Sequence, residues 1–277
     1  MPAGGAQPKS KASGTEMIGG GVFQTALDGE DNMEERDHRE GNRLYFSDDV
    51  PQQLIEEMEE QFPGIDKATA EALGQSIYGF SRGFDSYMNN SQQAWLEGKE
   101  LTDWGEMALN RAAWVENYIE KSPKFDSSKP LYRGLNSKDI RRYFENANPG
   151  DIYTPGRLSS ASSYMGTAEA FATKRTKANS VILEIEGPHK TAASIRHISH
   201  FPEENEVMFS ARSALKIISK YTDKDGILHV KAKSGAPDKT ITEKLRKLRL
   251  KPVNNKADVE KLGKIDKKNP PPLTKTK

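Results

Sequence analysis

Residues 201–209 read Phe-Pro-Glu-Glu-Asn-Glu-Val-Met-Phe, a cluster of acids that runs directly into a short apolar stretch. Alternate residues of a β-strand share one face, so we expect Glu204 and Glu206 to point the same way at the start of a strand. Two carboxylates held that close repel each other unless a cation or a substrate separates them, an arrangement typical of sites where chemistry occurs. A solvated acidic turn between two strands is the alternative interpretation.

A second candidate group lies upstream, at Tyr132-Arg133-Gly134, directly after Pro130 and Leu131 at the expected start of a β-strand. The planar guanidinium of arginine carries donors that match the geometry of phosphate oxygens, so Arg133 can bind a diphosphate in a bidentate manner. The alternative for this short motif is an ion pair with a carboxylate at a strand edge.

A third candidate group, Ser160-Ala161-Ser162, lies between the other two in the sequence. A serine hydroxyl both donates and accepts hydrogen bonds, so a strand that presents several of them can hold a ribose hydroxyl and a carboxylate in a fixed relation. A polar strand end, or a helix cap before Thr167, is the alternative interpretation.

The three groups lie in the strand-rich half of an α+β pattern. Residues 48–122 repeat apolar side chains at helical spacing, from Val50 to Ile119, and predict three or four helices. Residues 128–233 contain short β-branched or apolar runs bounded by turn residues, and these predict at least six strands. We therefore expect one catalytic unit over residues 48–233.

Both ends of the chain have the composition of solvated segments. Residues 1–47 are rich in Gly, Ala, Ser and charged residues, and we expect them to be disordered or loosely docked. Residues 234–277 form a Lys- and Pro-rich tail, in which residues 239–251 carry three apolar side chains at helical spacing among basic ones. This basic amphipathic helix would either pack its apolar face on the domain or bind nucleic acid, an acidic partner or a membrane surface.

The composition excludes several classes of protein. The chain has 277 residues, no cysteine and a formal net charge of +1, which rules out disulfides, a cysteine nucleophile and cysteine-ligated zinc. No stretch reaches the roughly 20 apolar residues of a membrane span, and the first residues lack the apolar core of a signal peptide. We expect a soluble protein; its oligomeric state stays open, with a monomer favoured.

In this order, the Arg, Ser-x-Ser and Glu-x-Glu groups resemble the signature elements of arginine-specific mono-ADP-ribosyltransferases, the R-S-E class that includes bacterial toxins, effectors and phage enzymes. The resemblance covers residues 48–233, with 48–122 similar to the family's helical lobe and 128–233 similar to its β-rich catalytic core. It implies an N-terminal helical lobe packed on a two-sheet antiparallel or mixed β core that forms the NAD cleft. The sequence departs from the family pattern at Ala161, where the family has threonine, and at Glu203, which adds a third acid.

The resemblance implies a role in NAD binding for the first two groups. Arg133, next to Gly134, would bind the phosphates of NAD. Ser160, together with Ser162, would orient NAD and the catalytic carboxylate.

The resemblance assigns the chemistry to the acidic group. Glu206 would be the catalytic glutamate, which stabilises the cationic, oxocarbenium-like ribose as nicotinamide leaves. Glu204 would hold the arginine acceptor and act as a general base. Phe201 occupies the place of the aromatic residue that helps to recognise the target, or it is an ordinary apolar anchor for the loop.

The implied activity is transfer of ADP-ribose from NAD to arginine side chains of a target protein, with release of nicotinamide. NAD is then a consumed substrate rather than a recycled cofactor. The reaction needs no metal, and His197 and His200 lie in an expected loop that we do not interpret as a metal site.

Two alternatives to the transferase activity stay open. One is an NAD glycohydrolase that uses the same site, and the other is a non-catalytic virion or interaction protein on this scaffold. The resemblance to this family implies that the protein acts in the cytoplasm of a target or infected cell, after non-classical delivery or phage infection.

Overall fold

The computed structural model describes residues 52–81, 85–125, 129–199, 201–251 and 272–275. The predicted leader, 1–47, and most of the predicted tail, 252–271, lie outside these ranges. Within the described ranges, we find no helix whose length and hydropathy would allow it to cross a membrane.

The described chain begins with helices that pack against one another. They are α2 (Gln52–Gln61), α3 (Lys67–Gly79), α4 (Asp85–Leu96) and α5 (Asp103–Lys121). The N-cap Asp66 of α3 accepts a hydrogen bond from the Thr69 N–H (3.0 Å), and the N-cap Thr102 of α5 accepts one from the Gly105 N–H (3.2 Å). These caps satisfy backbone donors that the first turn of a helix leaves without intrahelical partners.

The strands that follow form a mixed sheet. They are β1 (Leu131–Asn136), β2 (Ile152–Tyr153), β3 (Ser159–Ser162), β4 (Ser180–Glu186), β5 (Ala192–Ser194), β6 (Glu206–Phe209), β7 (Leu215–Thr222) and β8 (Leu228–Ser234). Two helices interrupt them, α6 (Lys138–Asn146) and α7 (Met165–Thr173). The order across the sheet is β2-β7-β8-β4-β1-β3-β6-β5, with parallel pairing between β4 and β8 and antiparallel pairing elsewhere among the described strands.

The structure corrects the prediction of a two-sheet core. One residue pair, Tyr132 with Ser162, joins β1 to β3, whereas β1 pairs with β4 along its whole length. Because this single pair connects β1 to β3, the strands in the described part of the chain form one eight-stranded sheet. Within that sheet, two groups of strands, β2-β7-β8-β4-β1 and β3-β6-β5, are joined through this short β1–β3 contact.

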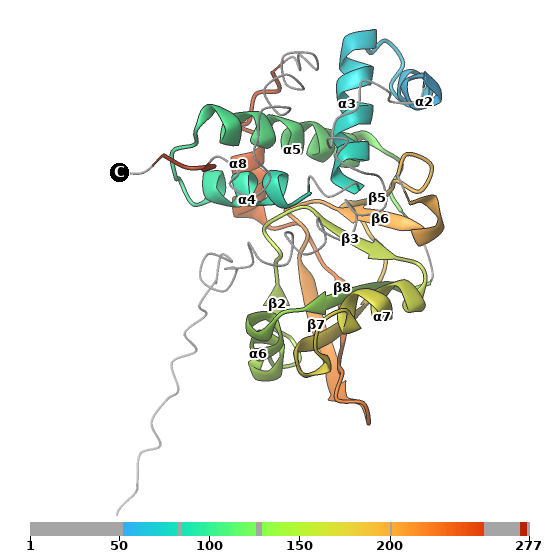
Figure 1. The fold of residues 1–277 in the computed structure, drawn as a ribbon, viewed down its shortest axis with the longest axis vertical. Helices are drawn as coiled ribbons and strands as arrows, with labels where there is room; N and C mark the ends of the chain where they lie inside the picture. Colours follow the sequence, from blue (N-terminus) through green and yellow to red (C-terminus); the bar gives the residue numbers. More distant parts are fainter. Residues whose placement is uncertain (1–51, 82–84, 126–128, 200, 252–271, 276–277) are drawn as a thin grey trace, which may run out of the picture.

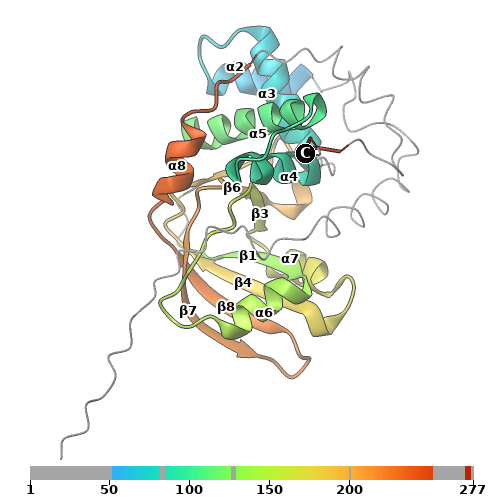
Figure 2. The ribbon, with the colours of Figure 1, turned by 90° about the vertical axis from the view of Figure 1, so that its left-hand side faces the viewer.

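The helices and the sheet enclose buried side chains on both faces of β6. Met208 lies in the same buried cluster as Ile77 of α3 and Val115 of α5. Val207 and Phe209, which alternate with it, belong to a second buried cluster. Figure 1 shows α3 and α5 over the β3-β6-β5 end of the sheet, and Figure 2 shows α6 and α7 against the part that contains β1 and β4. The start of β6 therefore lies where the helices meet the sheet.

The predicted basic helix is shorter than its sequence pattern indicated. α8 spans Lys239–Leu245, whereas the prediction covered residues 239–251. After α8 the backbone hydrogen bonds span three residues instead of four, so the α-helix ends there. Ile241 of α8 is 4% exposed and packs with Leu96 of α4.

A buried carboxylate connects the helices to the strands. Glu116 of α5 accepts hydrogen bonds from Gln92 Nε2 of α4 (2.8 Å), from the Ala211 N–H after β6 (2.8 Å) and from the Ser210 hydroxyl. Gln92 Oε1 in turn accepts one from the Leu158 N–H before β3 (3.2 Å). This network attaches the ends of β3 and β6 to two helices, and burial raises the pKa of Glu116.

We expect Glu116→Gln to make the folded state less sensitive to pH. A glutamine keeps a carbonyl acceptor for Gln92 and Ala211 and offers an amide donor to Ser210. Because burial raises the pKa of Glu116 in the folded protein, the wild type loses stability as the pH rises through that pKa, and the uncharged variant does not. Denaturant unfolding at about pH 5 and about pH 8 measures this; a stability difference between variant and wild type that is equal at both pH values would contradict it.

Candidate active site

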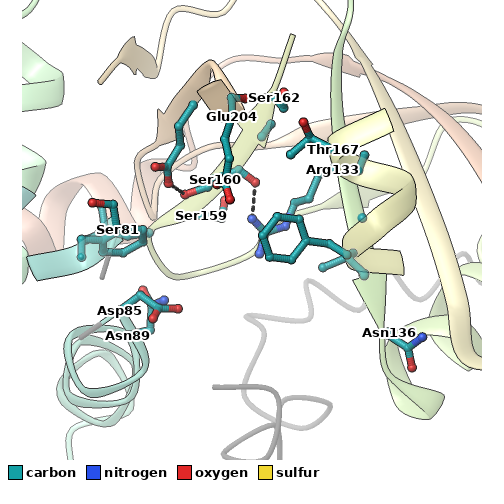
Figure 3. A pocket seen from close by; sticks show the side chains of 18 of the residues that line it. Ser81, Asp85, Asn89, Arg133, Asn136, Ser159, Ser160, Ser162, Thr167 and Glu204 are labelled. Atoms are coloured by element: carbon teal, nitrogen blue, oxygen red, sulfur yellow. Dashed lines mark hydrogen bonds between the residues drawn. The ribbon is translucent and has the colours of Figure 1, made fainter. Parts of the chain in front are cut away.

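A pocket opens where β1 and β3 meet, between the sheet and the helices (Figure 3). All of the residues predicted for NAD binding and catalysis line it: Arg133, Gly134, Ser160, Ser162, Glu204 and Glu206. Phe201, predicted for target recognition, is not among the described residues that line this pocket. The fold thus brings together groups that are separated by tens of residues in the sequence.

Arg133 lies on β1, opposite Leu183 of β4. Its Nη1 donates a hydrogen bond to the Ser160 backbone carbonyl, which links β1 to β3 (Figure 3). Burial, and then the positive charge of Arg157, lowers the pKa of Arg133 to about 10. The guanidinium is therefore still charged at neutral pH, and its partly desolvated position strengthens its attraction for an anion in the pocket.

Gly134 allows a helix to contact the strand that carries Arg133. A Cβ atom at Gly134 would lie 1.9 Å from the Ala168 carbonyl oxygen and 2.7 Å from the Ala172 backbone nitrogen, both on α7. The backbone of α7 therefore crosses β1 at a distance that a residue with a Cβ does not allow. This close packing also explains why residues at the end of α7 reach the pocket.

Glu206 is the first residue of β6, and two serine hydroxyls hold its carboxylate. Ser162 of β3 lies opposite Glu206 in the antiparallel pair, so Ser160, two residues earlier, shares its face of the sheet. The Ser160 hydroxyl donates to Glu206 Oε1, and the Ser199 hydroxyl donates to Oε2 at 3.0 Å. Glu206 is 7% exposed, so the protein itself orients this carboxylate.

Glu204 does not share a strand with Glu206, which corrects the prediction made from their spacing. Glu204 ends the 3-10 turn η3 (Pro202–Glu204), and Asn205 has a φ of 47°, in the left-handed region. That residue breaks the alternation on which the prediction depended. The Ser162 hydroxyl donates to the Glu204 backbone carbonyl (2.6 Å), and both glutamates still line the pocket.

Ser162 and Phe201 both hold backbone groups of this turn. Ser162 is 4% exposed, and its hydroxyl also accepts a hydrogen bond from the Tyr164 N–H (2.9 Å). Phe201 is half-buried; its N–H donates to the Ser199 hydroxyl (3.1 Å), and its carbonyl accepts from the Glu204 N–H (3.0 Å). The two residues therefore shape the approach of the chain to β6.

The pocket also contains polar residues that no sequence motif predicted. Asp85 and Asn89 come from α4, which faces the strands across the pocket (Figure 3). Arg157 precedes β3, and Lys174 and Arg175 follow α7. In the sequence these residues look like ordinary surface positions, because only the packing of α4 and α7 around β1 and β3 brings them to one place.

In the described part of the chain, no group of three or more His, Asp or Glu side chains could hold a metal ion. His197 Nε2 lies 4.0 Å from the Glu57 carboxylate and connects the loop before η3 to α2. His200 lies outside the described residues.

Comparison with known proteins identifies the fold. No protein-family model matches the sequence, and no curated protein matches it either. The structure is similar to Vis, an ADP-ribosyltransferase toxin from Vibrio splendidus. The Vis complex with agmatine has a TM-score of 0.50 and 16% identity, over 76% of this chain and 92% of that chain. A second Vis structure also has a TM-score of 0.50 and 16% identity, over 72% of this chain and 91% of that chain. The protein therefore has the fold of an ADP-ribosyltransferase, with Arg133, Ser160 and Glu206 in one pocket of that fold.

Proposed function

We propose that this protein is a mono-ADP-ribosyltransferase that transfers ADP-ribose from NAD to an arginine side chain of a target protein and releases nicotinamide. The observation that supports this most directly is the Glu206 carboxylate, held by Ser160 in the pocket that also contains Arg133. A negative charge beside a fixed positive charge suits a substrate that develops a cation close to a diphosphate. The fold is compatible with this activity.

The diphosphate of NAD would bind the cationic part of the pocket. Arg157 lies near enough to lower the pKa of Arg133, and Lys174 and Arg175 line the same pocket. Several positive charges in one pocket favour a ligand with two negative charges, as a diphosphate has. Because Arg133 contacts the Ser160 carbonyl, a diphosphate held there would leave the adjoining ribose close to β3.

The chemical step would break the bond between C1′ of the ribose and the nicotinamide nitrogen. Both electrons of that bond leave with neutral nicotinamide, and the ribose becomes an oxocarbenium-like cation. The Glu206 carboxylate would stabilise this cation. Because Ser160 and Ser199 already orient it, the carboxylate needs no reorganisation as the charge develops.

Glu204 would hold the arginine acceptor. A guanidinium is a cation whose donors match a carboxylate, and Glu204 lines the pocket from the η3 turn. One guanidine nitrogen attacks C1′ and forms the new C–N bond, while its proton passes to the Glu204 carboxylate. Vis has been solved in complex with agmatine, a guanidine compound, which supports an acceptor of this class.

Nicotinamide release from NAD, measured with and without agmatine, tests the proposal. We expect agmatine to accelerate release by the wild type, and Glu204→Gln to lower the agmatine-dependent rate about 10²-fold while slow hydrolysis continues, because the general base is lost. Glu203→Gln is the matched control, since Glu203 is exposed on the same turn. It should leave both rates unchanged.

The same assay separates the alternatives. A release rate that agmatine does not change would identify water as the acceptor and the protein as an NAD glycohydrolase. If the wild type released no nicotinamide at all, that result would contradict an enzymatic function and favour a non-catalytic protein with this fold. Mass spectrometry of the agmatine product would show whether ADP-ribose is attached to the guanidine group.

A further inference from the structure

Ser199 belongs to none of the sequence motifs, yet it contacts the carboxylate of Glu206, which lines the pocket. It lies in the loop between β5 and η3 and is 8% exposed. Its hydroxyl donates to Glu206 Oε2 (3.0 Å) and accepts from the Phe201 N–H (3.1 Å). One buried hydroxyl thus connects the first residue of β6 with the turn that carries Glu204.

The backbone around Ser199 is held without the help of its side chain. The Ser199 N–H donates to the Ile195 carbonyl (2.7 Å), and the Ile195 N–H donates to the Glu206 backbone carbonyl (3.0 Å). Ile195 is fully buried in the cluster beneath the helices. Removing the Ser199 hydroxyl should therefore leave the loop attached to β6.

Two donors restrict the Glu206 carboxylate more than one donor can. The terminal torsion of a glutamate side chain is broad, so a carboxylate bound through one oxygen can still rotate. Ser160 holds Oε1 and Ser199 holds Oε2, and both are hydroxyl donors to an ionisable acceptor, which form strong hydrogen bonds when that acceptor is charged. Together they fix the plane of the carboxylate.

We infer that Ser199 is a positioning residue for the transfer reaction: its hydroxyl fixes the orientation of the Glu206 carboxylate and ties it to the turn from Phe201 to Glu204. The kinetic consequence rests on the proposed function. The structural consequence, the orientation of Glu206, is independent of it.

Steady-state nicotinamide release by Ser199→Ala, Ser199→Thr and the control Ser194→Ala tests the kinetic consequence. We expect Ser199→Ala to lower kcat about 10- to 100-fold. The KM for NAD should change less than about twofold, because the ground-state contacts of the diphosphate are elsewhere. Ser199→Thr keeps the hydroxyl and should restore most of kcat. Ser194 lies on β5, away from the pocket lining, and Ser194→Ala should behave as the wild type.

Three kinetic outcomes would overturn the inference. The first is a kcat for Ser199→Ala within about twofold of the wild type. The second is a Ser199→Thr variant as slow as Ser199→Ala, since the hydroxyl would then be irrelevant. The third is a loss of kcat that follows a loss of thermal stability across the variants, which would mark a purely structural role.

Crystal structures of the wild type and Ser199→Ala decide the structural consequence without any measurement of activity. We expect the Glu206 carboxylate to rotate and the turn at Phe201 to shift once the hydroxyl is absent. An unchanged Glu206 would overturn the inference. If the wild type released no nicotinamide while Glu206 moved in the variant, the proposed function would fail and the positioning role would stand.

Discussion

Glu206→Gln is expected to lower nicotinamide release about 10²- to 10³-fold, both with and without agmatine. The substitution exchanges a negative charge for a neutral amide of the same shape, so it removes the electrostatic stabilisation of the ribosyl cation. The packing should survive, because the Ser160 and Ser199 hydroxyls can each donate to or accept from an amide. Both rates should fall together, since transfer and hydrolysis pass through the same cation.

The release assay is paired with calorimetric titration of NAD to separate chemistry from binding. We expect the affinity for NAD to change far less than the rate, since the diphosphate would bind at Arg133. Glu203→Gln is again the control, because it removes the same charge from an exposed position three residues earlier. A Glu206→Gln variant that keeps more than about a tenth of the wild-type rate would contradict the proposed role of Glu206.

Gly134→Ala is expected to destabilise the protein by roughly 2–3 kcal/mol and to lower its melting temperature by about 5–10 °C. The new Cβ would lie 1.9 Å from the Ala168 carbonyl oxygen and 2.7 Å from the Ala172 nitrogen. These are backbone atoms of a helix, which cannot rotate away as a side chain can. The whole of α7 must move off β1, and Asn136, whose Nδ2 donates to the Ala172 carbonyl, would lose that partner.

Gly166→Ala, on α7, is the matched control for Gly134→Ala on β1. Nothing lies within 4 Å of a Cβ at Gly166, and alanine favours a helix over glycine by about 1 kcal/mol. We therefore expect this variant to be as stable as the wild type or slightly more stable. Thermal unfolding followed by circular dichroism compares the three proteins. Equal melting temperatures for Gly134→Ala and the wild type would contradict the direct packing of α7 on β1.

Local patterns in the sequence predicted the elements that carry the candidate site. The apolar run Val207-Met208-Phe209 predicted a strand that starts at Glu206, and β6 begins at that residue. Leu131-Tyr132-Arg133 predicted a second strand, and Arg133 lies on β1. These predictions succeed because alternation and β-branched or aromatic composition are properties of consecutive residues.

Predictions that needed the path of the backbone were less successful. Glu204 was expected on the strand face of Glu206, but Asn205 adopts a left-handed conformation and ends the alternation. The basic segment 239–251 was expected to be helical throughout, but α8 ends at Leu245. In both cases the spacing of the apolar or charged residues is compatible with more than one backbone conformation, and tertiary packing selects one of them.

The sequence alone determined which chemical groups are available here and their order along the chain: a strand arginine, a serine-rich strand and a pair of acids. It also predicted that residues 48–122 are helical and that strands follow over residues 128–233. Only the tertiary structure decided that the Ser199 hydroxyl donates to the second carboxylate oxygen of Glu206 and that Gly134 allows α7 to pack closely on β1. It alone decided that the single pair between Tyr132 and Ser162 makes one sheet. The physical reason is the distance along the sequence. The periodicity of apolar residues depends only on residues a few positions apart, whereas these contacts join distant segments that are brought together by hydrogen bonding and burial across the whole domain.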